Sequence, residues 1–131
     1  MSADAVVKAC LSDVPKTVAA GVVDMGTGML MGIKTVESHP QAVIDILAPA
    51  TKEMFEGEMV ISIENLFKQA RGVKNNDRYF QEIIISSTHL WHYFGRIKAA
   101  PTVVLCVVCR ADVNLGMMVM KARQICQTAT I

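Results

Sequence analysis

The sequence predicts an α/β fold: a three-layer α-β-α sandwich with a five-stranded, mostly antiparallel sheet and one long central helix. Residues 102–109 are apolar without alternation, which is typical of a central strand that is buried on both faces. The patterns along the chain run helix, two strands, long helix, three strands, helix, and this order favours the sandwich. Two apolar stripes on the long helix indicate that it needs a second surface to cover it. We expect one domain over residues 1–131.

The beginning of the chain predicts a helix and a β-hairpin. Residues 2–13 carry apolar side chains at helical spacing, and Pro15 ends that helix. Residues 17–24 and 29–36 are expected to be two strands that are joined by a turn with two glycines. These glycines superficially resemble a phosphate-binding loop, but the stretch lacks an adjacent Gly-Lys pair and leads into a strand instead of a helix. We therefore expect a hairpin turn and no nucleotide site.

The long helix is predicted from His39 to Gly72. A serine and a proline suit its first turn, and cationic residues followed by glycine suit its end. At ~1.5 Å per residue it would be roughly 45 Å long, whereas five strands are only about 20–25 Å wide, so one end would overhang the sheet. Pro49 should kink the helix, and Gly57 costs about 1 kcal/mol relative to alanine. The alternative is two shorter helices that meet near Gly57.

The second half of the chain predicts three strands and a helix. The strands are expected at residues 80–86, 90–94 and 102–109. A short connection is expected at residues 95–101, before the last strand. The final helix is capped by Asp112 or Asn114 and runs to about Gln127. Its predicted buried face consists of Leu115, Met118, Val119, Ala122, Ile125 and Cys126.

Composition narrows the class of protein. Hydrophobic residues make up 52% of the 131 residues, yet no apolar run is long enough to span a membrane and no signal segment leads the chain. We therefore expect the surplus apolar surface to enter a protein interface, without direct membrane insertion. A net charge of +1 with interspersed signs argues against nucleic acid as a partner. Four cysteines without a signal segment predict reduced thiols and a cytoplasmic location.

The sequence contains two pairs of residues with the spacing of metal or redox sites. These pairs are Cys106 with Cys109 and His89 with His92. Residues three apart on a strand point to opposite faces, so neither pair can converge on one ion, and we expect structural thiols instead. No nucleophile or carboxylate pair has a recognisable arrangement. We predict no catalytic residue, no metal ligand and no cofactor, so the protein is not expected to be an enzyme.

Two segments resemble the roadblock/dynein light chain superfamily. Residues 110–123 place an Asn-Leu-Gly helix start after an apolar strand, and residues 19–29 form a hairpin with an acidic, glycine-containing turn. The order of elements also matches along nearly the whole chain. The resemblance implies a dimer, homo- or heteromeric, in which two five-stranded sheets join edge to edge and the central helices pair. Prokaryotic members often work with small Ras-like GTPases, and eukaryotic relatives serve dynein and lysosomal signalling complexes.

We therefore predict a non-enzymatic, dimeric regulatory or scaffold module that binds a small GTPase or another signalling partner. The dimer contact is placed on Met54, Phe55, Met59, Ile63, Leu66, Phe67, Ile83, Ile84 and Ile85. A set of charged residues is either a solvated helix face or a partner-binding rim, and it comprises Lys52, Glu53, Glu56, Glu64 and Lys68. The alternatives are a small-molecule sensor with a ligand near Trp91 and Tyr93, and a structural adaptor in a larger complex.

Overall fold

The computed structural model describes residues 1–36 and 41–131. The elements follow the predicted order of helices and strands. Their bounds are α1 Ala3–Asp13, β1 Thr17–Asp24, β2 Met29–Thr35, α2 Gln41–Glu56, α3 Glu58–Arg71, β3 Glu82–Ser86, β4 Leu90–Ile97, β5 Ala100–Arg110 and α4 Leu115–Thr128. The hairpin of β1 and β2 is confirmed, and Gly28 in its turn adopts a φ of 73°, which favours glycine.

The apolar run near the end of the chain forms the central strand of the sheet. The strand order is β2-β1-β5-β4-β3, and all neighbouring strands are antiparallel. Side chains of β5 alternate between two cores, with Leu105 and Val107 packed against α1 and α4, and Val104 and Cys106 packed on the side of α2. Both faces of β5 are therefore buried, which confirms the prediction made from its missing alternation.

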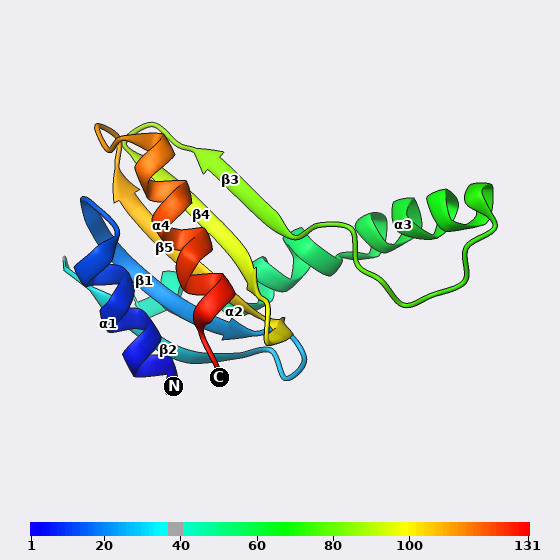
Figure 1. Ribbon diagram of the computed structural model, residues 1–131, viewed down its shortest axis with the longest axis horizontal. Helices are drawn as coiled ribbons and strands as arrows, with labels where there is room; N and C mark the ends of the chain where they lie inside the picture. The colour runs from blue at the N-terminus through cyan, green and yellow to red at the C-terminus, as the bar shows by residue number, and fades with distance from the viewer. Residues whose placement is uncertain (37–40) are drawn as a thin grey trace.

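Helices cover both faces of the sheet, so the three-layer architecture is confirmed. Figure 1 shows α1 and α4 side by side on one face and α2 on the other. The first layer buries Val6 and Met118, and the second buries Ala48 and Phe55. By contrast, α3 projects away from the sheet and covers neither face (Figure 1).

Two expectations about the second half of the chain are wrong. The predicted connection 95–101 is largely strand, because β4 continues to Ile97 and pairs with β5 through Gly95 and Arg96. Leu115 does not belong to the buried face of α4, since 38% of its surface is exposed. Of the two predicted caps, Asn114 is the one used, and its side chain accepts a hydrogen bond from the backbone N–H of Met117 at 3.0 Å.

The predicted long helix is interrupted at Gly57. The expectation of one continuous helix is therefore wrong, and the alternative of two shorter helices is confirmed. Gly57 has φ −62° and ψ 161°, an extended conformation that separates α2 from α3. A Cβ atom here would collide with the carbonyl oxygen of Glu53, so the bend depends on glycine. Pro49 lies within α2 without ending it, and the predicted helix start at His39 lies outside the described residues.

We expect the substitution Gly57→Ala to lower the free energy of unfolding by about 1–3 kcal/mol, because the added methyl group must displace the backbone at the bend. Urea denaturation at one fixed protein concentration measures the effect. Gly116→Ala is the matched control: its Cβ would lie 3.4 Å from Asn114 Oδ1, and alanine should be neutral or stabilise α4 by up to about 1 kcal/mol. Unchanged stability of Gly57→Ala would mean that a straight helix is equally accessible.

Candidate partner-binding surface

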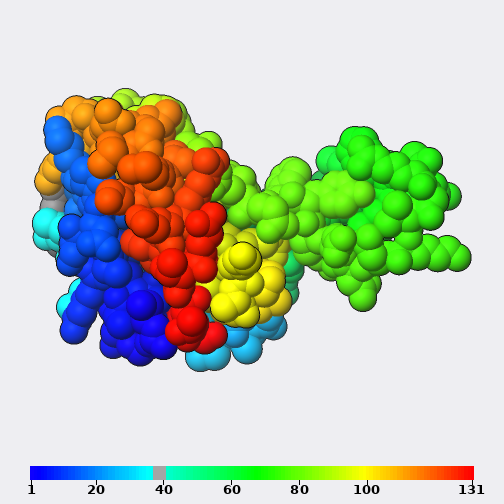
Figure 2. Space-filling model, in the orientation of Figure 1, coloured from blue at the N-terminus to red at the C-terminus, as the bar shows by residue number. Residues whose placement is uncertain are grey.

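Residues 58–81 form a projection that we call the arm. It consists of α3 and of the segment 72–81, which returns along α3 to the start of β3 (Figure 1). Gly72 ends α3 with a φ of 65°, and its N–H and that of Val73 donate to carbonyl groups of the last turn. Figure 2 shows the arm standing clear of the body, to which it is joined by a narrow neck.

Two buried charged side chains hold the returning segment against α3. The ammonium group of Lys68 donates hydrogen bonds to the carbonyl oxygens of Asn75 at 3.1 Å and Asp77 at 2.6 Å. The carboxylate of Glu64 accepts from the backbone N–H of Tyr79 at 2.6 Å and from Nη1 of Arg78 at 3.2 Å. Only 1% of Glu64 and 7% of Lys68 is exposed. Neither residue is part of a solvated face or a free rim, because each is buried with its hydrogen bonds satisfied.

The arm exposes an apolar stripe along α3. This arm stripe consists of Met59, Ile63, Leu66 and Phe67, which are 74%, 46%, 65% and 49% exposed. Ala70 joins three of them around a shallow hollow of about 360 Å³. A helix of 14 residues is marginally stable by itself in water, and its apolar face is usually covered by packing. The arm stripe is therefore a candidate surface for contact with another molecule.

The two edges of the sheet differ in how far they are open to another strand. The edge strand β2 has a register irregularity opposite Val22 and Val23, which disfavours pairing with a further strand. Strand β3 pairs with β4 in regular register over Glu82–Ser86 and contains no proline or lysine. Ile84 and Ile85 are 40% and 36% exposed, whereas Ile83 packs partly against the core on the α2 side. The outer edge of β3 is thus the edge suited to strand pairing.

Phe55 does not belong to the exposed part of this surface. Its side chain is 0% exposed and lies in the core between α2 and the sheet, so it is not available to the predicted dimer contact in this conformation. Helical periodicity could not show that the helix breaks at Gly57, which leaves Phe55 over the sheet and Met59 on the projecting arm. Met54 also packs partly against that core. The guanidinium carbon of Arg96 lies 5.2 Å from the centre of the Phe55 ring, where cation and ring attract.

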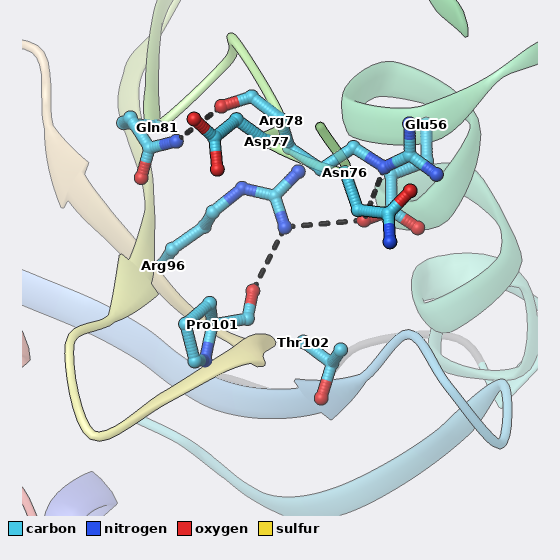
Figure 3. A pocket seen from close by; sticks show the side chains of 8 residues that line it. All are labelled: Glu56, Asn76, Asp77, Arg78, Gln81, Arg96, Pro101 and Thr102. Carbon is cyan, nitrogen blue, oxygen red and sulfur yellow. Dashed lines mark hydrogen bonds and ion pairs between the residues drawn. The ribbon is translucent and has the colours of Figure 1, made fainter. Parts of the chain in front are cut away.

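Glu56, at the end of α2, links the arm to the body of the protein at the narrow neck between them. Its Oε1 accepts a hydrogen bond from Nη1 of Arg96 at 3.1 Å and lies 3.9 Å from Nε of Arg78 (Figure 3). Glu56 is therefore mainly a structural link, whereas Lys52 and Glu53 are exposed and free to meet a partner. Sequence reasoning missed Arg96 because residues 95–101 were expected to be a connection. If the strand predicted at 90–94 had been extended to Ile97, the sequence would have placed the charged Arg96 within a strand of the sheet.

The remaining polar clusters are structural. The hydroxyl of Tyr93 donates to Oε2 of Glu82 at 2.6 Å, and burial together with this bond raises the pKa of Tyr93. The guanidinium of Arg123 binds the same carboxylate and is the main cause that lowers the pKa of Glu82. Trp91 packs partly against the core under α1 and α4. The predicted ligand site near Trp91 and Tyr93 thus coincides with a packed region, with a hollow of about 190 Å³ beside Tyr93.

The cysteines are free, buried thiols. Burial raises the pKa of Cys106 to about 12, so this thiol stays protonated and unreactive at neutral pH. Cys106 and Cys109 lie in cores on opposite faces of the sheet, as their spacing on a strand predicts. Within residues 1–36 and 41–131, no group of three side chains could hold a metal ion. No helix in the same described part of the chain is long and apolar enough to cross a membrane.

We expect Glu64→Ala to loosen the arm, because the N–H of Tyr79 would lose its acceptor and Arg78 its ion-pair partner. Leaving a buried donor unpaired costs about 1–3 kcal/mol, so amide hydrogen exchange over residues 75–79 should accelerate on the order of tenfold or more. Mass spectrometry of the exchange measures this. Asn65→Ala, at the adjacent exposed position of α3, should leave the rate unchanged. Equal exchange in both variants would contradict the structural role of Glu64.

Several solved structures have the same architecture as this chain. No protein-family model and no curated protein matches the chain by sequence. A structure of MglB in a tetrameric arrangement superimposes with a TM-score of 0.69 at 15% identity, covering 94% of this chain and 81% of that chain. The gliding protein MglB from Thermus thermophilus gives 0.67 at 16% identity and covers 94% and 82%.

The description of a third solved structure names its domain family. It is a roadblock/LC7 domain from Streptomyces avermitilis, which superimposes with a TM-score of 0.64 at 11% identity and covers 96% of this chain and 92% of that chain. At these low identities the likeness concerns the arrangement of helices and strands. The chain therefore has the roadblock/LC7 fold, as the resemblance of its sequence predicted.

Proposed function

We propose that this protein is a non-enzymatic, dimeric regulatory or scaffold module that binds a small Ras-like GTPase or another signalling partner. The observation that carries the proposal is the arm stripe, an apolar helix face that stands clear of its own chain. The roadblock/LC7 fold supports it, because the sequence resemblance implies dimers and GTPase partners. An MglB with this fold occurs in a tetrameric arrangement, which is consistent with a fold that self-associates.

In the proposed dimer, the β3 edges of two copies pair and each arm covers apolar surface of its partner. Pairing would satisfy the open backbone groups of Glu82–Ser86 and bring Ile84 and Ile85 of both copies together. With 14 residues, α3 is about 21 Å long at ~1.5 Å per residue, so it can reach across a joined edge. Of the predicted contact residues, the exposed Met59 fits this arrangement, whereas Met54 and Ile83 pack partly against the core of their own subunit and Phe55 lies within it.

We expect Met59→Asp to weaken the dimer severely. Burial of one large apolar side chain contributes about 1.5–3 kcal/mol, so the dissociation constant should rise roughly 10- to 100-fold. Sedimentation equilibrium measures it. Met120→Asp is the matched control, since Met120 is 52% exposed on α4, at the other face of the sheet, and its replacement should leave the dimer intact. If Met59→Asp dimerises as tightly as the unaltered chain, the arm stripe is not the dimer contact.

The outer face of α2 is the surface that we propose for the signalling partner. Exposed Ile46 and Ala50 lie four residues apart on the helix, and Lys52 and Glu53 border them. An apolar centre with a charged rim is the usual anatomy of a transient protein interface. This placement keeps two of the five predicted rim residues and leaves out Glu56, Glu64 and Lys68, because they hold the arm. The protein would act by positioning the catalytic groups of the GTPase itself.

We expect the double charge reversal Lys52→Glu with Glu53→Lys to abolish partner binding while the dimer persists. The assay is affinity purification of the tagged chain from its native cells with a GTP analogue or GDP present, followed by mass spectrometry. A small GTPase in stoichiometric amount that the variant loses supports the proposal. Lys8→Glu with Asp13→Lys on α1 is the matched control and should retain the partner. Recovery of the dimer alone, or of a stable set of other subunits, would favour the sensor or the adaptor instead.

A further inference from the structure

We propose that the neck of the arm contains a binding site for a small carboxylate. A pocket of about 640 Å³ opens here between the arm and the ends of β4 and β5, and Figure 3 shows its lining. The residues that line it are Glu56, Asn76, Asp77, Arg78, Gln81, Arg96, Pro101 and Thr102. All of these residues except Pro101 are polar or charged, in contrast to the arm stripe. The proposal does not depend on the dimer or on a GTPase partner.

Arg96 is the central donor of this carboxylate site. Its side chain is 4% exposed, and its Nε and Nη1 donate to the carbonyl oxygens of Phe80 at 2.7 Å and Pro101 at 2.8 Å. Nη1 also donates to Glu56 at 3.1 Å, so the guanidinium is fixed in place. The buried Nη2 finds no hydrogen-bond partner among the residues that the structure describes. Because an unpaired buried cationic donor is costly, this nitrogen marks the place of a missing acceptor.

Further unused donors surround Arg96. The side chains of Asn76 and Thr102 line the pocket and form no hydrogen bond within the described part of the chain. Arg78 uses Nη1 for Glu64, and its side chain is 36% exposed. In Figure 3 the guanidinium of Arg96 lies between Pro101 on the body and the segment of Asn76 and Arg78 on the arm. A ligand bound here would contact the body and the arm together.

The charges of the lining favour a carboxylate over a phosphate. Two arginines and two acids, Glu56 and Asp77, give the pocket a formal charge of zero. A phosphate dianion would be repelled by both acids, whereas a carboxylate carries less charge and matches the geometry of a guanidinium. The carboxylate could belong to a free acid or to an acidic side chain of a protein. A ligand that touches both parts would favour one orientation of the arm.

NMR titration of the ¹⁵N-labelled full chain tests the site with four probes. These are propionate, the capped tripeptide acetyl-Ala-Glu-Ala-amide, inorganic phosphate and, as a neutral control, propionamide. We expect saturable shifts of the amides of residues 76–81 and of Thr102 with a carboxylate, at a dissociation constant on the order of 1 mM. Saturation by propionate alone assigns the site to a free acid, and saturation by the peptide as well assigns it to acidic side chains.

Variants separate binding from folding. Arg96→Lys removes the unpaired nitrogen and should abolish saturation, but it also removes bonds that hold the neck. Asn76→Ala with Thr102→Val leaves those bonds intact and should weaken binding about tenfold. Gln69→Ala, on the exposed side of α3, should bind like the unaltered chain. The proposal is overturned if neither carboxylate saturates, if propionamide shifts the same amides equally, or if phosphate binds more tightly.

Discussion

The close approach of Gly57 to the carbonyl oxygen of Glu53 shapes the rest of this molecule. Because glycine has no Cβ that would collide with this oxygen, the chain can bend out of the helical path here. The helix α3 therefore departs from the sheet instead of lying across it. The body keeps a complete core with helices on both faces. The arm that results has few apolar neighbours of its own, so its stability and its exposed stripe both call for a second molecule.

Buried charge compensates for the apolar core that the arm lacks. Glu64 and Lys68 satisfy backbone groups of the returning segment, and Glu56 links that segment to Arg96 in the sheet. These interactions are directional, so they fix the shape of the arm more strictly than apolar contacts of similar area would. They also explain how an interaction surface can stand clear of the body and still present a defined face. Specific geometry is what the proposed regulatory module would need in order to choose its partner.

The proposed dimer contact, the outer face of α2 and the neck pocket lie on different parts of one connected unit. The arm stripe and the β3 edge would face a second copy, while the outer face of α2 would remain open to a signalling partner. The neck joins these surfaces, because Glu56 ends α2 and contacts both Arg78 of the arm and Arg96 of the body.

The sequence by itself determined the order of elements, the central strand and the hairpin, because local periodicity and turn residues encode them. It also indicated the exposed apolar residues Met59, Ile63, Leu66 and Phe67, since two stripes on one helix exceed what a single sheet can cover. Only the tertiary structure showed that the helix breaks at Gly57, and this is why Phe55 belongs to the core while Met59 is exposed on the arm. It alone brought Arg96 to Glu56, 40 residues away, because burial and pairing over such distances depend on the folded chain as a whole.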